Sequence, residues 1–343
     1  MFELKFYYLC VKILLRQKSE VDNQMEKAIA KSKVKAEKGN NTNLVGKGNM
    51  IQLWIMCMIP IGVLAIMHYL PMVGIIVAFK NFKYARGIFG SDWCGLDNFK
   101  MFFTSDGFLK LLRNTLGMNF LFIIVGTVVA VGIAIMLFEI KSRTATKVFQ
   151  TTLITPNFIS WVLVSYMAFA ILNPEYGYIN KILKIFGIEP INFYSKPNAW
   201  PMILLICNTW KKMGMDSIIY YATMMSIDSA LFEAADIDGA KRRDKVKYII
   251  LPEMVSILTI TTILKIGNIF HADFGLFYQV PRNTGGLYDT TDVIDTYIFR
   301  TMRTVGNMGV SSAVSLLQSF VGMVMVILTN TVVKKVSPEN ALF

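Results

Sequence analysis

The chain has 343 residues, of which 54% are hydrophobic and only 17% are charged. Soluble domains carry about 25% charged residues, so this chain has too little charge to cover a soluble surface, and its apolar excess also excludes a disordered or fibrous protein. The formal net charge of +12 would suggest a nucleic-acid partner on a polar surface. In a membrane protein, the same excess is typical of cytoplasmic loops, and we interpret it in that way.

The first fifty residues differ from the rest of the chain in their polarity. The apolar run Phe6–Leu15 is too short to cross a membrane, and no small-residue cleavage site follows it, so it does not resemble a signal peptide. Lysines recur from Lys27 to Lys47 among helix-forming residues. We predict that residues 1–50 form a basic cytoplasmic tail with a solvated helix, and a partner-docking helix is the alternative.

Six runs have the length and apolar character of membrane-spanning helices, which need about 20 mostly apolar residues. The runs are Ile51–Phe79, Thr115–Phe138, Val148–Leu172, Trp200–Ile227, Met254–Phe270 and Val314–Val333. The fourth is the least regular, because Lys211, Lys212 and Asp216 interrupt it. The sequence therefore predicts an all-α integral membrane protein with a six-helix transmembrane domain over residues 51–336.

The distribution of Lys and Arg predicts the orientation of these spans. With a cytoplasmic amino terminus, the segments assigned to the cytoplasm are clearly richer in Lys and Arg than those assigned to the outside. Both termini are then cytoplasmic, as is the loop 229–252 after the fourth span. Residues 337–343 are predicted to be a short cytoplasmic tail.

Signatures of catalysis are scarce in this sequence. The two histidines, His68 and His271, do not stand in metal-binding or hydrolase motifs, and no phosphate-binding loop is present. The four cysteines lie far apart without C-x-x-C spacing, which argues against a disulfide framework or a zinc site. The chain is therefore predicted not to be an enzyme and to bind no metal, and any ATP that drives it must be bound by another chain.

The loop after the fourth span reads SALFEAADIDGAKRRDKVKYIILP, from Ser229 to Pro252. Helix formers precede Gly239, which ends or bends a helix, and a strongly polar run leads to the next span. This pattern predicts a short surface helix, a glycine turn and a second helix that enters the membrane. Small side chains at Ala234 and Ala235 would let another protein approach the backbone, although a solvated connecting loop is the simpler interpretation.

The combination of Glu233-Ala234-Ala235, Gly239 and Ile249-x-Leu251-Pro252 resembles the EAA loop of binding-protein-dependent ABC importer permeases. Further segments resemble the oligosaccharide and polysaccharide permeases of the carbohydrate-uptake group, from about residue 50 to the end. They are NTL at Asn114, NPEYGYIN from Asn173, WKKMGMDSIIY from Trp210, GNIFHADF from Gly267 and DVIDTYIFR from Asp292. The loop departs from the pattern at Ser256, where a proline is common.

The resemblance implies a type I importer subunit with a MetI-like permease fold in a bacterial cytoplasmic membrane. Its EAA loop would form a coupling helix seated in a cytoplasmic ATPase, so that ATP-driven closure rocks the permease between outward-open and inward-open states. The implied coupling positions are Glu233, Ala234, Ala235, Asp238 and Gly239. The implied partners are a second, different permease subunit, two ATPase subunits that bind ATP and Mg²⁺, an extracellular lipid-anchored binding protein and an oligosaccharide.

Polar and aromatic residues in the last three spans are the candidates for contact with a carbohydrate, which needs aromatic faces and groups that satisfy hydroxyls. They are Asn208, Trp210, Lys211, Lys265, Asn268, His271, Asp273 and Gln318. Each taken alone is better explained by contacts between helices. As a group they are typical of a bundle interior or a watery cavity.

Three lysines within spans are the unusual feature, because an unpaired lysine facing lipid costs several kcal/mol. Lys212 and Asp216 are four residues apart, which predicts a local pair, whereas Lys265 has no carboxylate at helical spacing. We hypothesise that Lys265 and Lys211 line the cavity and favour an acidic saccharide. Snorkelling, or pairing with a partner subunit, is the competing explanation.

Two other classes of protein remain as alternatives. An ion-coupled secondary carrier would need repeats or broken helices near the membrane midplane, and no inverted repeat is evident. A membrane-embedded enzyme would need a dyad or a metal site that two distant histidines do not supply.

Overall fold

The computed structural model describes residues 47–105, 107–336 and 338, and it divides into two units, residues 1–72 and 73–343. The predicted tail 1–50 lies outside the described residues except for 47–50, and the predicted tail 337–343 lies outside them except for 338. In the first unit, helix α2 (Lys47–Leu64) contains Pro60 and continues as a π-helical turn, Ala65–Tyr69. A 3₁₀ segment, Leu70–Phe79, leads into the second unit.

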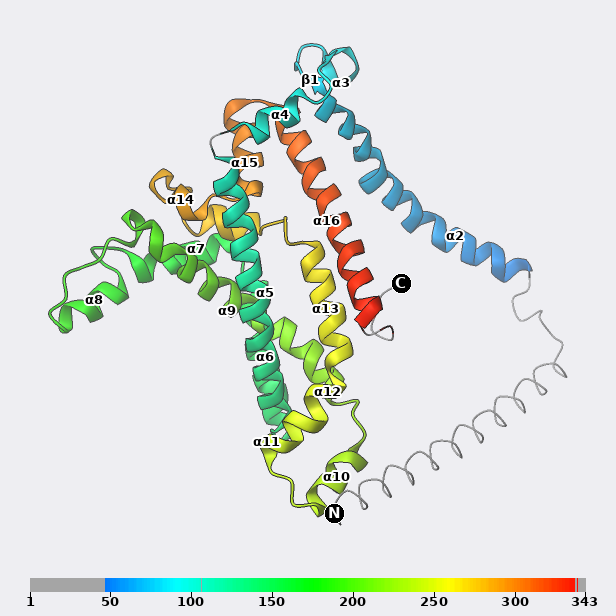
Figure 1. Cartoon of the computed structure of the whole chain (residues 1–343), viewed down its shortest axis with the longest axis vertical. Helices are drawn as coiled ribbons and strands as arrows, with labels where there is room; N and C mark the ends of the chain where they lie inside the picture. Colours follow the sequence, from blue (N-terminus) through cyan, green and yellow to red (C-terminus); the bar gives the residue numbers. More distant parts are fainter. Residues whose placement is uncertain (1–46, 106, 337, 339–343) are drawn as a thin grey trace. The chain divides into compact units, whose positions relative to one another are not determined.

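The second unit begins with a small hairpin and a long helix (Figure 1). Strand β1 (Lys80–Asn81) pairs antiparallel with β2 (Asp92–Trp93), with the turn helix α3 (Gly87–Gly90) between them. The Lys80 ammonium group closes this hairpin, because it donates to the carbonyls of Ile88 (2.9 Å) and Phe89 (3.0 Å). Helix α4 (Asp97–Phe103) and the 31-residue helix α5 (Phe108–Phe138) follow.

The middle of the chain contains two helices joined by a sharp bend and a lateral hairpin. Helices α6 (Arg143–Phe158) and α7 (Trp161–Leu172) meet at 96°. Helix α8 (Tyr178–Ile185) and two 3₁₀ turns, Phe193–Ser195 and Pro197–Ala199, lead to the 25-residue helix α9 (Trp200–Met224). Helix α9 packs along α5 and α6, so that these three helices form the centre of the second unit.

The last part of the chain starts with helix α10 (Ser229–Ile237) and ends with two packed helices. The polar run becomes α11 (Arg242–Lys245), a π turn (Val246–Ile250) and α12 (Leu251–Glu253), which bends by 58° into α13 (Val255–Gly267). A connecting segment holds a π turn (Gly275–Gln279), a 3₁₀ turn (Gly285–Leu287), α14 (Tyr288–Thr291), α15 (Ile294–Arg300) and a further π turn (Thr301–Val305). Helix α16 (Met308–Val336) packs against α13.

Glycines allow the closest helix contacts in the second unit. A Cβ atom on Gly214 of α9 would collide with the carbonyl group of Leu153 in α6. A Cβ atom on Gly267 of α13 would collide with Val326 of α16, and one on Gly322 would lie 2.8 Å from the Gly267 carbonyl oxygen. Such small residues let membrane helices approach to backbone contact.

The helices only partly match the predicted spans. Within the described ranges, three helices are long and apolar enough to cross a membrane, or five if each bent pair counts as one span. Helix α9, the predicted fourth span, is one continuous helix, but it is not among these five because Lys211, Lys212 and Asp216 lie within it. Length and composition alone therefore leave the six-helix count a prediction.

The predicted third span, Val148–Leu172, is not a single helix. Pro156 has no N–H to donate near the end of α6, and the chain turns into extended backbone at Ile159 and Ser160. The hydroxyl oxygen of Ser160 then caps α7 by accepting from the Leu163 N–H at 3.3 Å. Hydropathy cannot detect this break, because every residue around it is compatible with a membrane interior.

The segment between α13 and α16 is tied to the start of α5. The Asn114 amide donates to the carbonyls of Asp289 (3.1 Å) and Asp292 (3.0 Å), and the hydroxyl of Thr115 accepts from the Ile294 N–H. Lys110 forms a hydrogen-bonded ion pair with Asp289, which holds the pKa of that carboxyl below its usual value. These contacts fix one end of the bundle above the polar cavity described next.

Candidate functional site

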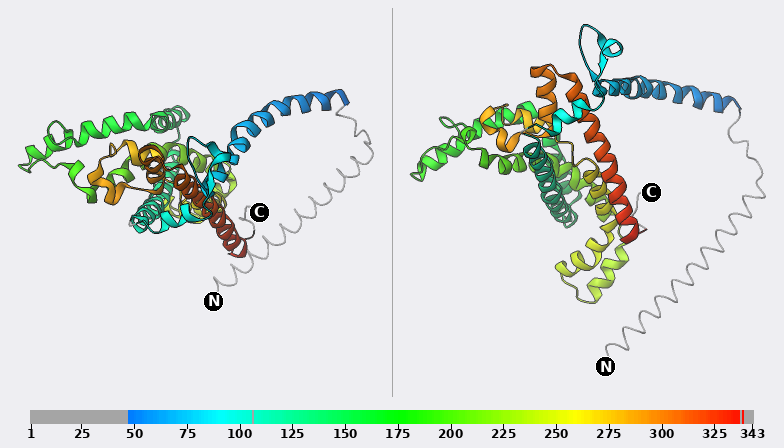
Figure 2. Two further views of the ribbon diagram at one scale, coloured as in Figure 1. Left: turned by 90° about the horizontal axis from the view of Figure 1, so that it is seen from above. Right: turned by 45° about the horizontal axis from the view of Figure 1, so that its top comes forward.

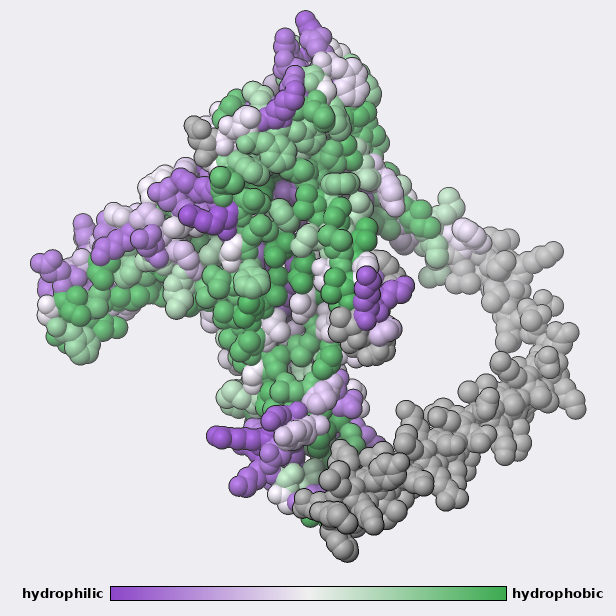
Figure 3. Space-filling model, in the orientation of Figure 1, coloured by the Kyte–Doolittle hydropathy of each residue, from purple (hydrophilic) through white to green (hydrophobic). Residues whose placement is uncertain are grey.

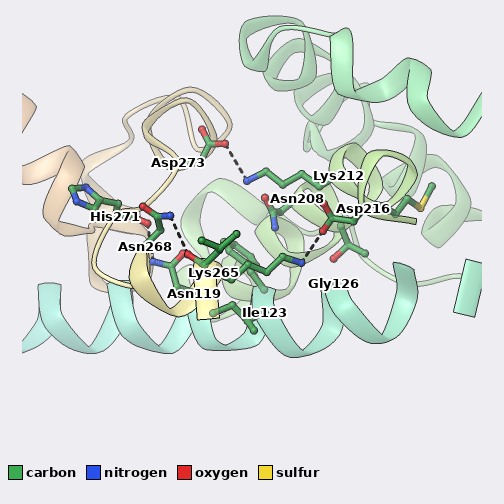
Figure 4. A pocket seen from close by; sticks show the side chains of 14 residues that line it. Asn119, Ile123, Gly126, Asn208, Lys212, Asp216, Lys265, Asn268, His271 and Asp273 are labelled. Carbon is green, nitrogen blue, oxygen red and sulfur yellow. Dashed lines mark hydrogen bonds and ion pairs between the residues drawn. The ribbon is translucent and has the colours of Figure 1, made fainter. Parts of the chain in front are cut away.

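A polar cavity of about 300 Å³ lies between α5, α9, α13 and the segment that follows α13 (Figure 4). Amide and charged side chains of these helices line the space between them (Figure 4). Its lining residues are Asn119, Phe122, Ile123, Gly126, Asn208, Thr209, Lys212, Met213, Asp216, Leu264, Lys265, Asn268, His271 and Asp273. The cavity, called the chamber below, thus brings amides and charged groups together between largely apolar helices.

Two ion pairs between different elements cross this cavity. Lys265 of α13 donates to Asp216 of α9, with Nζ and Oδ2 2.9 Å apart, and both side chains are little more than a quarter exposed. Lys212 of α9 lies 3.5 Å from Asp273, which follows α13. Figure 4 shows the two lysines reaching in different directions across the chamber. The local pair that the sequence predicted between Lys212 and Asp216 is therefore wrong, because each residue has a partner on another element.

Lys211 does not line the cavity, contrary to our hypothesis. It is buried, and its ammonium group donates to the carbonyls of Pro156 (3.3 Å), Asn157 (2.7 Å) and Ile159 (2.5 Å) at the break between α6 and α7. The same group lies 5.3 Å from the centre of the Trp161 ring. Lys211 thus supplies donors to carbonyls that the broken helix leaves without their usual partners.

Two polar atoms at the cavity have no hydrogen-bond partner among the residues that the structure describes. They are the side-chain carbonyl oxygen of Asn208 and the hydroxyl of Thr209, both in α9. Asn208 is only 5% exposed. A buried polar atom without a partner costs about 1–3 kcal/mol. Both atoms are shielded from solvent in this conformation, so a hydroxyl group reaches them only if the surrounding side chains move.

The other amides at the cavity donate to backbone carbonyls, and the histidine side chain lies near a carboxylate. The Asn119 amide donates to the carbonyls of Ile269 (2.7 Å) and His271 (3.1 Å), and the Asn268 amide donates to Leu264. His271 Nδ1 lies 3.9 Å from Asp295. These contacts fix the positions of the side chains around the chamber.

Five of the eight predicted substrate residues come together at this cavity: Asn208, Lys265, Asn268, His271 and Asp273. Trp210 packs beside the hydrophobic cluster around Trp200 and Leu204 instead. Gln318 is buried beside a separate apolar cavity of about 230 Å³, where its amide donates to the Phe270 carbonyl (2.7 Å) and to Asp295 (3.2 Å). The roles of all eight in binding substrate remain predictions.

The α5 wall of the cavity was missed by the sequence analysis, which searched only the last three spans. Asn119, Phe122, Ile123 and Gly126 follow the helical spacing i, i+3, i+4 and i+7, so they share one face. A polar residue such as Asn119 within an otherwise apolar span was the available signal. Lys212 was recognised, but it was assigned to the wrong partner.

The predicted coupling positions lie on α10 and its C-terminal turn. The Asp228 carboxylate accepts from the Ala230 N–H at 3.0 Å and caps the helix. At the other end Gly239 has φ of 72°, and the N–H groups of Gly239 and Ala240 donate to the carbonyls of Asp236 and Ala235. This is a Schellman motif, which requires a left-handed residue where glycine stands.

Helix α10 is held on one side and open on the other. The ring of Phe232 packs against Phe138 of α5, with the ring centres 5.6 Å apart. Leu231, Ala234 and Ile237 are exposed, and Ile237 is 88% so. Hydrophilic residues gather near α11 at this end of the second unit, while apolar residues cover α5 and α16 (Figure 3). The result is a short helix with an apolar strip in a hydrophilic setting.

A bundle of apolar helices around a chamber lined by amides and charged groups, with an exposed short helix after α9, is the architecture expected of a membrane permease. Comparison with known proteins identifies the kind of permease. The chain belongs to the family described as binding-protein-dependent transport system inner membrane component, whose model matches residues 123–338. It is therefore a transporter subunit of an importer in the plasma membrane, and it spans that membrane several times.

The chain is similar over most of its length to two proteins of Bacillus subtilis (strain 168). It is 33% identical to the polygalacturonan/rhamnogalacturonan transport system permease protein YteP over 272 residues. This alignment covers 79% of this chain and 84% of YteP. It is 31% identical to protein LplB over 275 residues, and this alignment covers 80% of this chain and 86% of LplB.

Solved structures agree with these relatives. The fold resembles a chain in the crystal structure of a bacterial ABC transporter involved in the import of the acidic polysaccharide alginate, with a TM-score of 0.76 and 30% identity over 83% of this chain and 96% of the other. A structure of the bacterial alginate ABC transporter in complex with a periplasmic protein that carries an alginate pentasaccharide matches with a TM-score of 0.75 and 30% identity, over 83% of this chain and 95% of the other. The type I importer permease fold expected from the sequence is confirmed by these matches.

Proposed function

We propose that this chain forms part of the path of an oligosaccharide through an ATP-driven importer. The observation that carries the proposal is the chamber itself, where amide and hydroxyl atoms of residues such as Asn119, Asn208 and Thr209 lie between the helices. Sugar hydroxyls are donors and acceptors at once, so they can satisfy such atoms without bringing a charge. The polysaccharides in the names of the relative YteP and of the alginate importer support this substrate class.

Matched hydroxyl deletions test this role of the chamber. Thr209 and Thr127 both have a hydroxyl without a partner among the described residues, but only Thr209 lines the cavity. In the complete importer reconstituted in liposomes, Thr209→Val is expected to raise the half-saturating oligosaccharide concentration about 5-fold, as a lost hydrogen bond of about 1 kcal/mol would. Thr127→Val should leave it unchanged. Equal effects of the two substitutions would contradict the proposal.

Lys212 is the residue that bears on whether the oligosaccharide is acidic or neutral. Lys265 is closely paired with Asp216 and Lys211 lies elsewhere, so the hypothesis of an acidic saccharide no longer rests on those two residues. Lys212 is 46% exposed and its distance to Asp273 is 3.5 Å, so it is the lysine better placed to meet a carboxylate. Lys212→Gln should then weaken uptake of an oligogalacturonate more than uptake of a neutral oligosaccharide. An equal loss for both would remove the acidic specificity.

The coupling role of α10 is the second part of the proposal. With both termini and α10 in the cytoplasm, the exposed strip of Leu231, Ala234 and Ile237 would seat in an ATPase subunit, with Glu233, Ala235, Asp238 and Gly239 beside it. ATP and Mg²⁺ would be bound by two such ATPase chains. A second permease subunit and an extracellular binding protein would complete the importer.

Substitutions at Gly239 test the coupling role. Valine is strained at a φ of 72°, whereas asparagine tolerates that region, so the two variants differ mainly in whether the Schellman turn survives. Affinity purification of the tagged chain from native membranes should recover an ATPase and a second permease with the wild type and with Gly239→Asn. Gly239→Val should lose the ATPase but keep the permease. Retention of the ATPase by Gly239→Val would exclude α10 as its seat.

The same preparation separates the proposal from an ion-coupled carrier. Uptake by the reconstituted complex should require internal ATP and persist when ion gradients are collapsed. Uptake that follows an ion gradient without ATP would instead support the carrier, which needs no coupling helix.

A further inference from the structure

The hairpin between α7 and α9, residues 173–199, projects from the side of the second unit in all three ribbon views (Figures 1 and 2). Its centre is Asn180, which is 3% exposed. The Asn180 amide donates to the carbonyls of Asn173 (3.0 Å) and Ile191 (2.9 Å), and its oxygen accepts from the Ile191 N–H (2.8 Å). One side chain thus joins both ends of the hairpin and fixes the direction of α8.

Aromatic side chains form a rigid base beneath this hairpin. Tyr194 makes edge-on contacts with Trp200 and Phe169, with ring centres 5.1 and 5.6 Å apart. The Trp200 indole N–H donates to the Phe193 carbonyl at 2.8 Å. The hairpin is therefore a defined part of the fold, and α8 has one orientation relative to the helix α7 that precedes it.

Helix α8 carries an apolar face that no described residue covers. Tyr178, Ile182, Ile185 and Phe186 are 65%, 54%, 81% and 75% exposed. Their spacing of i, i+4, i+7 and i+8 places them on one face of the helix. Figure 3 shows hydrophobic residues along one side of the projecting hairpin and hydrophilic residues along the other.

Cationic side chains lie beside this apolar face. Lys181 and Lys184 are exposed, and the Lys181 ammonium lies 5.4 Å from the centre of the Tyr178 ring. An apolar strip flanked by lysines, with a tyrosine at its edge, is the pattern of a helix that lies in the headgroup region of a bilayer. Tyrosine is also enriched at that depth in membrane proteins.

The position of α8 in the chain favours lipid over another protein as the partner. It begins six residues after the end of α7, which belongs to a candidate membrane span, so it lies close to the point where the chain leaves the hydrocarbon core. An eight-residue helix is about 12 Å long and cannot cross the bilayer itself. Helix α7 also exposes apolar residues, among them Leu163, Tyr166 and Ile171, so both arms of this corner carry apolar surface.

We propose that α8 lies flat in the bilayer interface, with Tyr178, Ile182, Ile185 and Phe186 inserted among the acyl chains and Lys181 and Lys184 at the phosphates. The helix anchors the outer end of the bent pair α6–α7 to the membrane surface. This anchoring holds the hairpin in place while the bundle around the chamber moves. The proposal needs the chain to span a membrane, but it does not need the chamber to bind a sugar.

Site-directed fluorescence in the assembled importer tests this placement. All four native cysteines are replaced by alanine, and single cysteines are introduced by Ile185→Cys on the apolar face or Lys184→Cys on the neighbouring polar edge. Both carry an environment-sensitive fluorophore in nanodiscs of phosphatidylcholine and phosphatidylglycerol. We expect lipids with a spin label near the headgroup to quench the probe at position 185 at least two-fold more than the probe at 184. Iodide in the buffer should show the reverse order.

Two outcomes would overturn the proposal. Equal and strong quenching of both probes by iodide would place α8 in water. Quenching of the probe at 185 by neither agent would mean that a protein surface covers this face. A second pair, Phe186→Cys with Lys181→Cys, repeats the comparison, so the result does not depend on one substitution.

Discussion

The chamber and helix α10 are built in opposite ways. Contacts in the chamber join elements that lie far apart in the chain. The ion pair between Lys265 and Asp216 spans 49 residues, and the Asn119 amide donates to a carbonyl 150 residues away. Helix α10 is defined within a few residues, by the Asp228 cap and by the turn at Gly239. The chamber therefore depends on correct assembly of the bundle, whereas the two ends of α10 are set by residues within the helix or next to it.

This difference suits the two tasks we propose for them. A chamber whose polar groups come from several helices changes shape when those helices move. A coupling helix has to keep its shape while it is pushed, and local caps provide that rigidity. Substitutions in the two regions should accordingly fail in different ways, and the following predictions use that contrast.

The largest effect is expected where α9, which forms one side of the chamber, packs against α6. Gly214→Ala places a methyl group where the Leu153 carbonyl stands, so α9 and α6 have to separate. We expect at least a ten-fold loss of assembled importer, measured by size-exclusion chromatography in mild detergent. Gly117→Ala is the matched control, because no described atom lies within 4 Å of that added methyl. A similar loss of assembled importer for both variants would show that replacing any helix glycine impairs assembly, whether or not the added methyl group collides with another helix.

Breaking one partner of the inner ion pair should have the next largest effect. Asp216→Asn leaves the Lys265 ammonium without its counter-charge in a largely apolar setting, at a cost of about 2 kcal/mol. The thermal midpoint of the purified complex should fall by several degrees. Asp216→Asn combined with Lys265→Met should recover most of the loss, because no unpaired charge remains. Additive losses in the double variant would contradict the pairing.

Removal of the α10 cap should have a smaller and more local effect. Asp228→Ala removes the acceptor for the Ala230 N–H, which costs about 1 kcal/mol of helix stability. Assembly and the thermal midpoint should be unchanged, while ATP-driven uptake falls a few-fold. Asp228→Ser, which keeps a capping oxygen, should restore uptake. Loss of assembled protein in Asp228→Ala would mean that α10 also supports the bundle.

The smallest effect on stability is expected at the outer ion pair. Lys212 and Asp273 are 3.5 Å apart and 46% and 28% exposed, so water screens their attraction. Asp273→Asn should change the thermal midpoint by no more than about 1 °C, as a contribution of a few tenths of a kcal/mol would. A change as large as that of Asp216→Asn would show that the two pairs act as one network.

The same contrast explains which features the sequence could predict. The helix 229–237, its glycine stop and the polar run after it depend on neighbouring residues, so pattern and propensity were sufficient. The membrane class also followed from composition. The partners of Lys212 and Lys265 could not be predicted, because they depend on how α9 and α13 pack. The local rule that paired Lys212 with Asp216 failed because a closer partner for each lies on another element.

The break in the third span illustrates a second limit. Pro156 was visible in the sequence, but a proline within an apolar run can bend a helix slightly or interrupt it completely. Which of these happens depends on whether the freed carbonyls find donors. Here the donor is Lys211, 52 residues after the last carbonyl it contacts.

Lys211 therefore takes the place of backbone N–H donors at the break between α6 and α7. Its ammonium group has three protons, and three carbonyls around the break, those of Pro156, Asn157 and Ile159, accept from it. Arginine is wider and methionine offers no donor, so neither reproduces this arrangement. The positive charge in the middle of α9 is consequently a structural component of the bend between α6 and α7, and Lys211→Met would leave these carbonyls without that donor.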